Sequence, residues 1–227
     1  MFLWRQKVKK FNIFCSLLVI FTMAISIIAL GQNITLRTTA TYTYYFNDTY
    51  VVSYVSSEYV NSEMSDKIAG FFNSWNPKEF QIYEDTGYDI EGIFDEKDSH
   101  NMLAIKRALD ISLVLGLVST IITVAIYRYF LKNDYKPVLR NRYKISAVLV
   151  IVTLIAEMVL LNTKKGMSII SANFGFVKLE HDSNLLTLLG GDFINLADNF
   201  LFGFTLIVFI AVTYTVHVLT KAPKIFF

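Results

Sequence analysis

Residues 111–131, ISLVLGLVSTIITVAIYRYFL, form a nearly uninterrupted apolar run. A helix needs about 20 such residues to cross the hydrocarbon core of a membrane, and this run has that length. Three further runs of the same kind lie at residues 11–30, 145–161 and 200–219. The sequence therefore predicts an integral membrane protein, an α-helical bundle of four transmembrane helices.

The composition leaves room for one further module outside the membrane. Apolar residues make up 54% of the 227, and the chain has only 3 Pro and 10 Gly. Such a chain can hold a soluble module of about eighty residues, but no separate large domain. We expect that module, a small α+β unit, in residues 32–110, the longest segment between two apolar runs.

If the four runs cross a membrane, the basic residues are concentrated on one side of it. Because the number of crossings is even, the N-terminal segment, the middle loop with its adjoining helix end and the C-terminal tail share a side. Together they carry twelve of the 21 basic residues and one acid, Asp134. By the positive-inside rule this side is cytoplasmic, which predicts a multi-pass protein of the cell membrane with both termini inside. Residues 32–110 then lie outside, where thirteen acidic residues against six basic ones disfavour binding of nucleic acid.

The expected organisation follows from these runs. It comprises an N-terminal segment and anchor at 1–31, the exofacial α+β module at 32–110, the second transmembrane helix at 111–131, a basic cytoplasmic loop at 132–144, the third helix at 145–161, a second exofacial segment at 162–199, and the fourth helix with its tail at 200–227. Within the second exofacial segment, the apolar stretch 185–189 is too short to span a membrane.

The first run has two interpretations. A basic segment precedes it, and Ala29 and Gly31 resemble the small-residue cleavage site of a signal peptide. Its length favours an uncleaved anchor instead. The single cysteine, Cys15, lies inside this run, where we expect it to face lipid. One cysteine can form neither an intrachain disulfide nor a cysteine-based zinc site.

The start of the outer module has strand-like and helix-like patterns in turn. Residues 34–46 are rich in Thr and Tyr with partial alternation, and residues 50–55 follow a turn, which together predict a β-hairpin. Ser57 can then cap a helix that opens at Glu58 and ends by Pro77, with its apolar residues on one stripe.

The end of the outer module predicts a second hairpin and a long helix. Residues 80–83 and 90–94 flank Gly87, which can supply the turn. Ser99 can cap a helix that continues into the second apolar run.

No strong catalytic motif is present: the sequence has no phosphate-binding loop, nucleophile elbow, zinc-spaced histidine pair or nucleotide fingerprint. His100 is the best candidate for a general base, because a neutral imidazole can accept a proton near neutral pH. The N-terminal turn of a helix disfavours the imidazolium form. Lys106 and Arg107 follow about two turns later, where they can stabilise an oxyanion or anchor the helix at the interface.

Two further residues are candidates on different grounds. Glu157 interrupts an apolar run, and an ionisable residue in a membrane helix is costly enough to suggest a function. His181, in Glu180-His181-Asp182, can complete a histidine–carboxylate site with His100. Each has a structural interpretation as well: Glu157 can find polar partners near the interface, and His181 can be a plain surface residue.

Several segments resemble the family of bacterial four-helix membrane proteins that includes the lipoprotein intramolecular transacylases. The resemblance covers an anchor, a Tyr-rich start of the outer module, residues 55–72 and residues 94–106. The family pattern places His-Met or His-Leu before Asp-Val-Lys, and here Met102, Ile105 and Lys106 match it. Asn101 stands at the place of the family's histidine, with His100 one position earlier. Ala104 stands at the place of the family's Asp.

Downstream, residues 185–193 resemble the family's apolar segment that ends in Phe. The second family histidine, expected at 165–170, has no counterpart.

The resemblance implies a reaction without a cofactor or metal. An acyl chain moves from the sn-2 oxygen of a lipoprotein's diacylglyceryl-cysteine to the α-amino group of that cysteine, so membrane lipid and bacterial lipoproteins are the expected partners. His100 is the expected base. Lys106, Arg107 or a Tyr hydroxyl is the expected oxyanion donor, and Glu157 or His181 is the group expected to orient the base.

A competing hypothesis is a non-catalytic membrane protein whose acidic outer module binds a partner, as a sensor, immunity-type protein or assembly factor. A small transporter is a weaker third, because the chain has no detectable inverted repeat.

Overall fold

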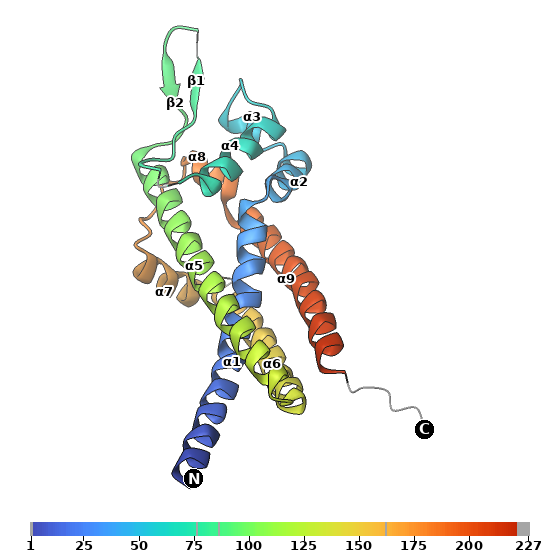
Figure 1. The fold of residues 1–227 in the computed structure, drawn as a ribbon. Coiled ribbons are helices and arrows are strands. Elements are labelled where there is room, and N and C mark those ends of the chain that lie inside the picture. The colour runs from blue at the N-terminus through green and yellow to red at the C-terminus, as the bar shows by residue number, and fades with distance from the viewer. Residues whose placement is uncertain (1, 76, 86, 162, 222–227) are drawn as a thin grey trace. The chain divides into compact units, whose positions relative to one another are not determined.

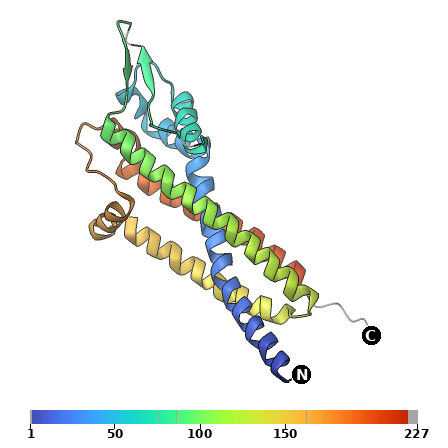
Figure 2. The same ribbon diagram turned by 60° about the vertical axis from the view of Figure 1, so that its left-hand side comes forward.

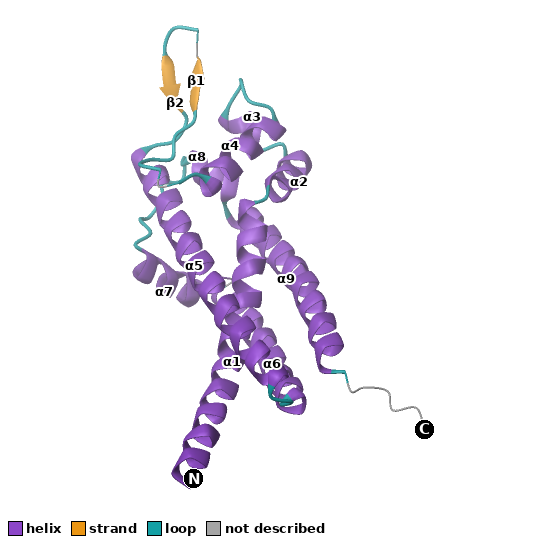
Figure 3. Ribbon diagram, in the orientation of Figure 1, coloured by secondary structure: helices purple, strands orange, loops and turns teal. Residues whose placement is uncertain are grey.

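The computed structural model describes residues 2–75, 77–85, 87–161 and 163–221. Helices dominate, and one short hairpin is the sheet in the described part of the chain (Figure 3). In chain order the elements are α1 (Phe2–Arg37), α2 (Thr39–Thr49), α3 (Val52–Val55), α4 (Asn61–Asn73), β1 (Tyr83–Asp85), β2 (Ile90–Gly92), α5 (Glu96–Lys132), α6 (Lys136–Leu161), α7 (Lys164–Phe174), α8 (Asn184–Leu189) and α9 (Gly191–Thr220), as labelled in Figure 1.

The chain forms two compact units. The first, called the helical unit, comprises Met1–Gly31, Ser112–Ala156 and Phe204–Phe227; the second, called the mixed unit, comprises Gln32–Ile111 and Glu157–Gly203. Four helices, α1, α5, α6 and α9, are long and apolar enough to cross a membrane. This confirms the integral membrane helical protein that the four apolar runs predict.

In the helical unit, α1 shows why its sequence suits a membrane span. Val19, Met23 and Ile27 recur at helical spacing and are buried against neighbouring helices, whereas Phe14 and Phe21 on the other side are exposed. A helix that is apolar on all sides is typical of a membrane span. Cys15 belongs to the buried side, at 6% exposed, so the expectation that it faces lipid is wrong. It fills space between helices as a small apolar residue.

Small residues let the membrane helices approach closely. A Cβ added to Gly116 of α5 would lie 2.6 Å from the Cβ of Ala29 in α1. A Cβ added to Gly31 would lie 2.0 Å from the Thr205 hydroxyl oxygen of α9. Thr22 and Thr123 add a hydrogen bond of 2.8 Å between α1 and α5. Association through such close contacts and interhelical hydrogen bonds is usual in membranes, where burial of apolar surface provides little driving force.

We expect Gly31→Ala to lower the free energy of unfolding in detergent micelles by about 1–3 kcal/mol, because the new methyl group must displace the Thr205 side chain. Gly203→Ala is the matched control. Gly203 lies within a membrane helix as Gly31 does, in α9 and not in α1, and nothing lies within 4 Å of an added Cβ there. Equal stability of the two variants would contradict the close approach of α1 and α9.

The mixed unit has its own aromatic core. Tyr42 of α2 and Phe193 of α9 stack with ring centroids 5.4 Å apart, and Phe46 and Phe72 are also buried there. The Tyr42 hydroxyl donates a 2.7 Å hydrogen bond to Leu36 O. Burial raises the pKa of Tyr42 far above the usual value for tyrosine. With one cysteine in the chain no disulfide can form, so aromatic packing and hydrogen bonds such as that of Tyr42 stabilise this core.

The first predicted hairpin is wrong. Residues 34–46 and 50–55 form the end of α1, α2 and α3, with no strand among them. Tyr42, Tyr45 and Phe46 are all buried, a helical spacing that places them together on the core. Thr and Tyr favour strands, but here a helix buries the Tyr side chains in the core. β propensity generally depends on such packing.

The predicted start of the next helix is also wrong, because α4 begins at Asn61 and not at Glu58. The Glu58 and Tyr59 N–H groups donate to the Ser56 hydroxyl, at 3.2 and 3.1 Å, so a side-chain turn at Ser56 precedes the helix.

The second hairpin is confirmed, with β1 antiparallel to β2. The long helix α5 begins at Glu96, three residues before the expected cap Ser99. Asp95 provides the cap instead, because its carboxylate accepts from Asp98 N at 2.6 Å.

Candidate functional site

The first turns of α5 are held by residues 175–183, which join α7 to α8 and are here called the strap. Figure 2 shows this segment rising from α7 to the beginning of α5. The hydroxyl of Ser183 donates to the Asp98 carboxylate at 2.5 Å, and Leu185 N donates to it at 3.3 Å. Asp98 is only 1% exposed. Its buried charge is thus satisfied at the start of α8, where backbone N–H groups lack helical partners.

Asn101 holds the middle of the strap. Its amide nitrogen donates to Val177 O at 2.9 Å, and its amide oxygen accepts from Val177 N at 2.9 Å. Asn101 is 4% exposed. One side-chain amide bonded to both backbone groups of a residue fixes the position of the strap along α5.

His100 meets the beginning of the strap. Its Nε2 lies 3.0 Å from Gly175 O, and the residue is exposed. Because a carbonyl oxygen can only accept, Nε2 carries the hydrogen, and the neutral ring then keeps its lone pair on Nδ1. Gly175 follows the last residue of α7 with φ +73°, a left-handed conformation that ends helices and favours glycine. The strap therefore orients the imidazole through Nε2 and leaves Nδ1 as the nitrogen that can accept a proton.

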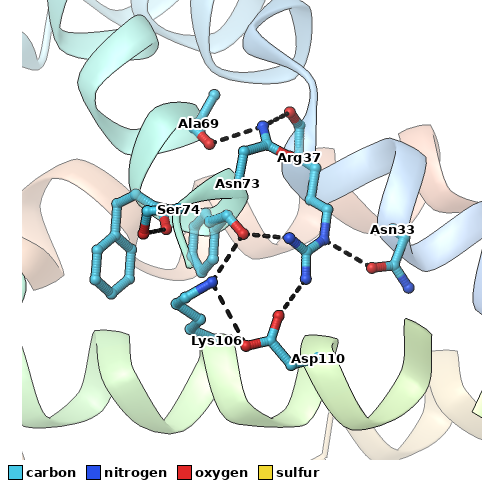
Figure 4. A network of polar contacts seen from close by, with 9 residues as sticks. Asn33, Arg37, Ala69, Asn73, Ser74, Lys106 and Asp110 are labelled. Atoms are coloured by element: carbon cyan, nitrogen blue, oxygen red, sulfur yellow. Dashed lines mark hydrogen bonds and ion pairs between the residues drawn. The ribbon is translucent and has the colours of Figure 1, made fainter. Parts of the chain in front are cut away.

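A second polar group, shown in Figure 4, centres on the carbonyl oxygen of Phe72. Lys106 Nζ donates to it at 3.0 Å, and the guanidinium of Arg37 donates to it as well. Both cations also pair with Asp110, Lys106 at 3.5 Å. Arg37 Nε donates to Asn33 at 2.8 Å.

The position of Phe72 explains why two cations meet there. Phe72 is the next-to-last residue of α4, so its carbonyl is among those without a helical partner at the negative end of the helix dipole. Lys106 is 3% exposed and Arg37 15%, whereas Asp110 is 47% exposed. The group joins α1, α4 and α5 in the mixed unit, and Asp110 is the counter-charge of both cations.

The remaining predicted site residues lie apart from one another. Glu157 is half-buried and accepts a 2.9 Å hydrogen bond from Gln32 Nε2. Arg107 is exposed, on the same face of α5 as His100 but nearly two turns further on. His181 is exposed within the strap, next to Glu180, which pairs with Lys97. In the part of the chain that the structure describes, no hydrogen bond or ion pair joins two of His100, Glu157 and His181.

Sequence reasoning missed Asp98, Arg37 and Asp110, and it named Asn101 only as the residue at the place of the family's histidine. One signal was available: Asp98, Lys106 and Asp110 are spaced by multiples of four residues, which places them on one side of a helix. Charged residues that share one side of a helix can indicate polar partners on a neighbouring segment. The contribution of the strap had no such signal, because irregular segments carry no periodicity. Among the described residues, no three of His, Cys, Asp or Glu gather in a way that could hold a metal ion.

Comparison with known proteins identifies the fold. No protein-family model matches the chain, and no curated protein matches it. Among solved structures, a histidine-to-alanine variant of the membrane integral lipoprotein intramolecular transacylase Lit from Bacillus cereus superposes with a TM-score of 0.75 at 13% identity, covering 97% of this chain and 98% of that one. Another structure of the same transacylase gives a TM-score of 0.70 at 14% identity, over 94% and 97%.

These comparisons place the chain in a class: an integral membrane protein with a lipoprotein transacylase fold. That fold, expected from the sequence resemblance, is confirmed over nearly the whole chain. The low identity is consistent with a distant relationship to the Bacillus cereus protein.

Proposed function

We propose that this protein moves an acyl chain within a lipoprotein, from the sn-2 oxygen of its diacylglyceryl-cysteine to the α-amino group of the same cysteine. The observation that carries the proposal is the His100–Gly175 contact, which leaves Nδ1 as an oriented base in a transacylase fold. The proposal places α5's first turns at the outer membrane face, and both termini inside, as the distribution of basic residues predicts.

The reaction needs one proton to move between two positions. The neutral α-amine of the cysteine attacks the ester carbonyl and a C–N bond forms, while His100 Nδ1 takes one proton from the attacking nitrogen. The tetrahedral intermediate collapses, the C–O bond to the glyceryl oxygen breaks, and the imidazolium returns the proton to that oxygen. The product is an N-acyl, S-monoacylglyceryl lipoprotein, and no oxidant, metal or cofactor takes part.

The other site residues have assigned roles in this proposal. Arg107, exposed on the His100 face, is the cation available to the oxyanion or to lipid phosphate. Lys106 acts through the Phe72 carbonyl and Asp110 as a positioning residue. The sequence assigns the orientation of the base to Glu157 or His181, and in this proposal Gly175 O takes that role.

A second candidate function rests on Asn101. The resemblance places the family's histidine at this position, and here a buried amide holds the strap instead. A chain that exchanged its base for a structural residue can keep the fold and bind lipoproteins without modifying them.

Mass spectrometry of lipopeptides separates the two candidates. The protein is expressed in a bacterial host that lacks N-terminal acylation of lipoproteins, with a vector-only strain for comparison. We expect N-acyl, S-monoacylglyceryl peptides to appear. Unchanged diacylglyceryl peptides, with the protein verified in the membrane, would support the binding function and overturn the catalytic one.

We expect Asn101→Ala to lower the rate of lyso-lipoprotein formation by about 10-fold or more, because the strap then loses its two hydrogen bonds to Asn101 and holds Gly175 less firmly against His100. Asn101→Gln is the second readout, since its longer side-chain amide can keep part of the contact with Val177 and should recover part of the rate. Thr120→Ala, which removes a hydroxyl bonded only within α5, is the control. An unchanged rate in Asn101→Ala would contradict the positioning role.

A further inference from the structure

The hairpin β1–β2 has two edges, and its register shows which backbone groups face outward. Glu84 pairs with Glu91, and Ile93 N donates to Ile82 O at 2.8 Å. In an antiparallel ladder, hydrogen-bonded pairs alternate with pairs whose backbone groups point away from each other. Tyr83 and Asp85 on β1, and Ile90 and Gly92 on β2, therefore direct their N–H and C=O groups outward.

The edge of β1 is closed by the protein itself. The Tyr59 hydroxyl donates to Tyr83 O at 2.6 Å, and Asp85 N donates to the Glu58 carboxylate at 2.9 Å. The Glu84 side chain accepts from the Ser57 hydroxyl at 2.7 Å and from two backbone N–H groups. These contacts, the Ser57 hydroxyl first, hold the pKa of Glu84 below its usual range.

The edge of β2 is open. Ile90 N donates to Asp89 Oδ1 at 2.8 Å, but within the described residues neither Ile90 O nor the backbone N–H and C=O of Gly92 has a partner. All three residues of β2 are exposed. In Figure 1 this edge faces away from α3 and α4. Beyond Gly92 the edge ends, because the Gln81 side chain bonds both Phe94 N and Phe94 O, at 3.0 and 2.6 Å.

The residues around the open edge of β2 are acidic, which favours a positively charged partner. Residues 79–96 include seven acidic residues and no Lys or Arg. Asp89 and Glu91 flank the open groups directly, and both are exposed. An unpaired strand edge accepts an extended peptide through backbone hydrogen bonds, and the acidic surroundings favour one with positive charge.

We propose that the outer edge of β2 binds an extended, basic segment of the lipoprotein polypeptide by strand addition. One residue of that segment exchanges two backbone hydrogen bonds with Gly92, and a residue two positions away donates to Ile90 O. The inference rests on the proposed function for the identity of the partner. It gives the protein a contact with the peptide part of its substrate, separate from the lipid.

Binding is tested with the full-length protein in detergent micelles and a lipid-free synthetic peptide in which Lys alternates with Ser and Thr. Calorimetry should show binding that weakens with salt, and a peptide with Glu in place of Lys should not bind. Glu91→Lys should weaken binding by about fivefold or more, with Glu91→Gln in between. Glu91→Lys should fold normally, because it places opposite charges across the hairpin from Glu84.

Residue-level hydrogen exchange locates the contact. The Gly92 amide should gain protection when the peptide binds, whereas the Glu91 amide, already bonded within the hairpin, should not change. Absence of binding, or binding without protection at Gly92, would overturn the inference. The proposed reaction fails in a different assay: lipopeptide mass spectrometry can be negative while the lipid-free peptide still binds, and positive while it does not.

Discussion

His100→Gln is expected to reduce formation of the lyso-lipoprotein by about 10²–10⁴-fold, the usual contribution of a general base. The glutamine amide can still donate to Gly175 O, so the strap should stay in place, but it cannot accept a proton near neutral pH. The loss should therefore appear in the rate of the chemical step and not in the amount of folded protein. The measurement is lipopeptide mass spectrometry at matched expression.

His217→Gln is the matched control for this prediction, because it removes an exposed histidine near the end of α9. We expect it to retain the activity of the unchanged protein. If His100→Gln kept comparable activity, His100 could not be the base, and the catalytic assignment would have to move to another residue or be abandoned.

Asp110→Asn is expected to lower the free energy of unfolding by about 2 kcal/mol. The substitution leaves Lys106 and Arg37, two largely buried cations, together at the Phe72 carbonyl without their shared counter-charge. Removing one partner of a fully buried ion pair costs about 3–5 kcal/mol, and the expected value is smaller because Asp110 is 47% exposed. Unfolding in detergent micelles, followed by circular dichroism, gives the difference.

Asp66→Asn is the control, since it changes an exposed carboxylate in α4 and should alter stability by less than about 0.5 kcal/mol. A second variant, Lys106→Met combined with Asp110→Asn, should recover part of the loss, because it removes one of the two repelling cations. No recovery in the double variant would show that the Lys106–Asp110 contact does not contribute as proposed.

The four membrane helices could be predicted from the sequence because each meets a simple physical requirement, enough apolar residues to cross hydrocarbon. The second hairpin was predictable for a similar reason: Gly87 supplies a positive φ of 77° at its turn. The Thr- and Tyr-rich segment was not, because Tyr42 and Tyr45 lie in helix α2 and pack against Phe193, which is distant in sequence.

In the candidate site, too, some features could be predicted from the sequence and others could not. His100 and Lys106 could be chosen as chemically interesting residues, but their surroundings depend on the partners that the fold brings to them. Gly175 O reaches His100 from a segment 75 residues away, and the Arg37 guanidinium shares Phe72 O with Lys106. The spacing of Lys106 and Asp110 places them on one side of α5, but the sequence does not show that this side meets Arg37 and the Phe72 carbonyl.

The burial of Cys15 has a practical consequence for mapping membrane topology. The chain's single thiol is enclosed among helices, so a membrane-impermeant maleimide should leave the unaltered protein unmodified. A cysteine placed at the fully exposed Tyr88 would then report by itself on which face of the membrane the hairpin lies. Labelling of intact cells at that position, compared with inverted vesicles, can assign the orientation of every helix from one chemical reaction.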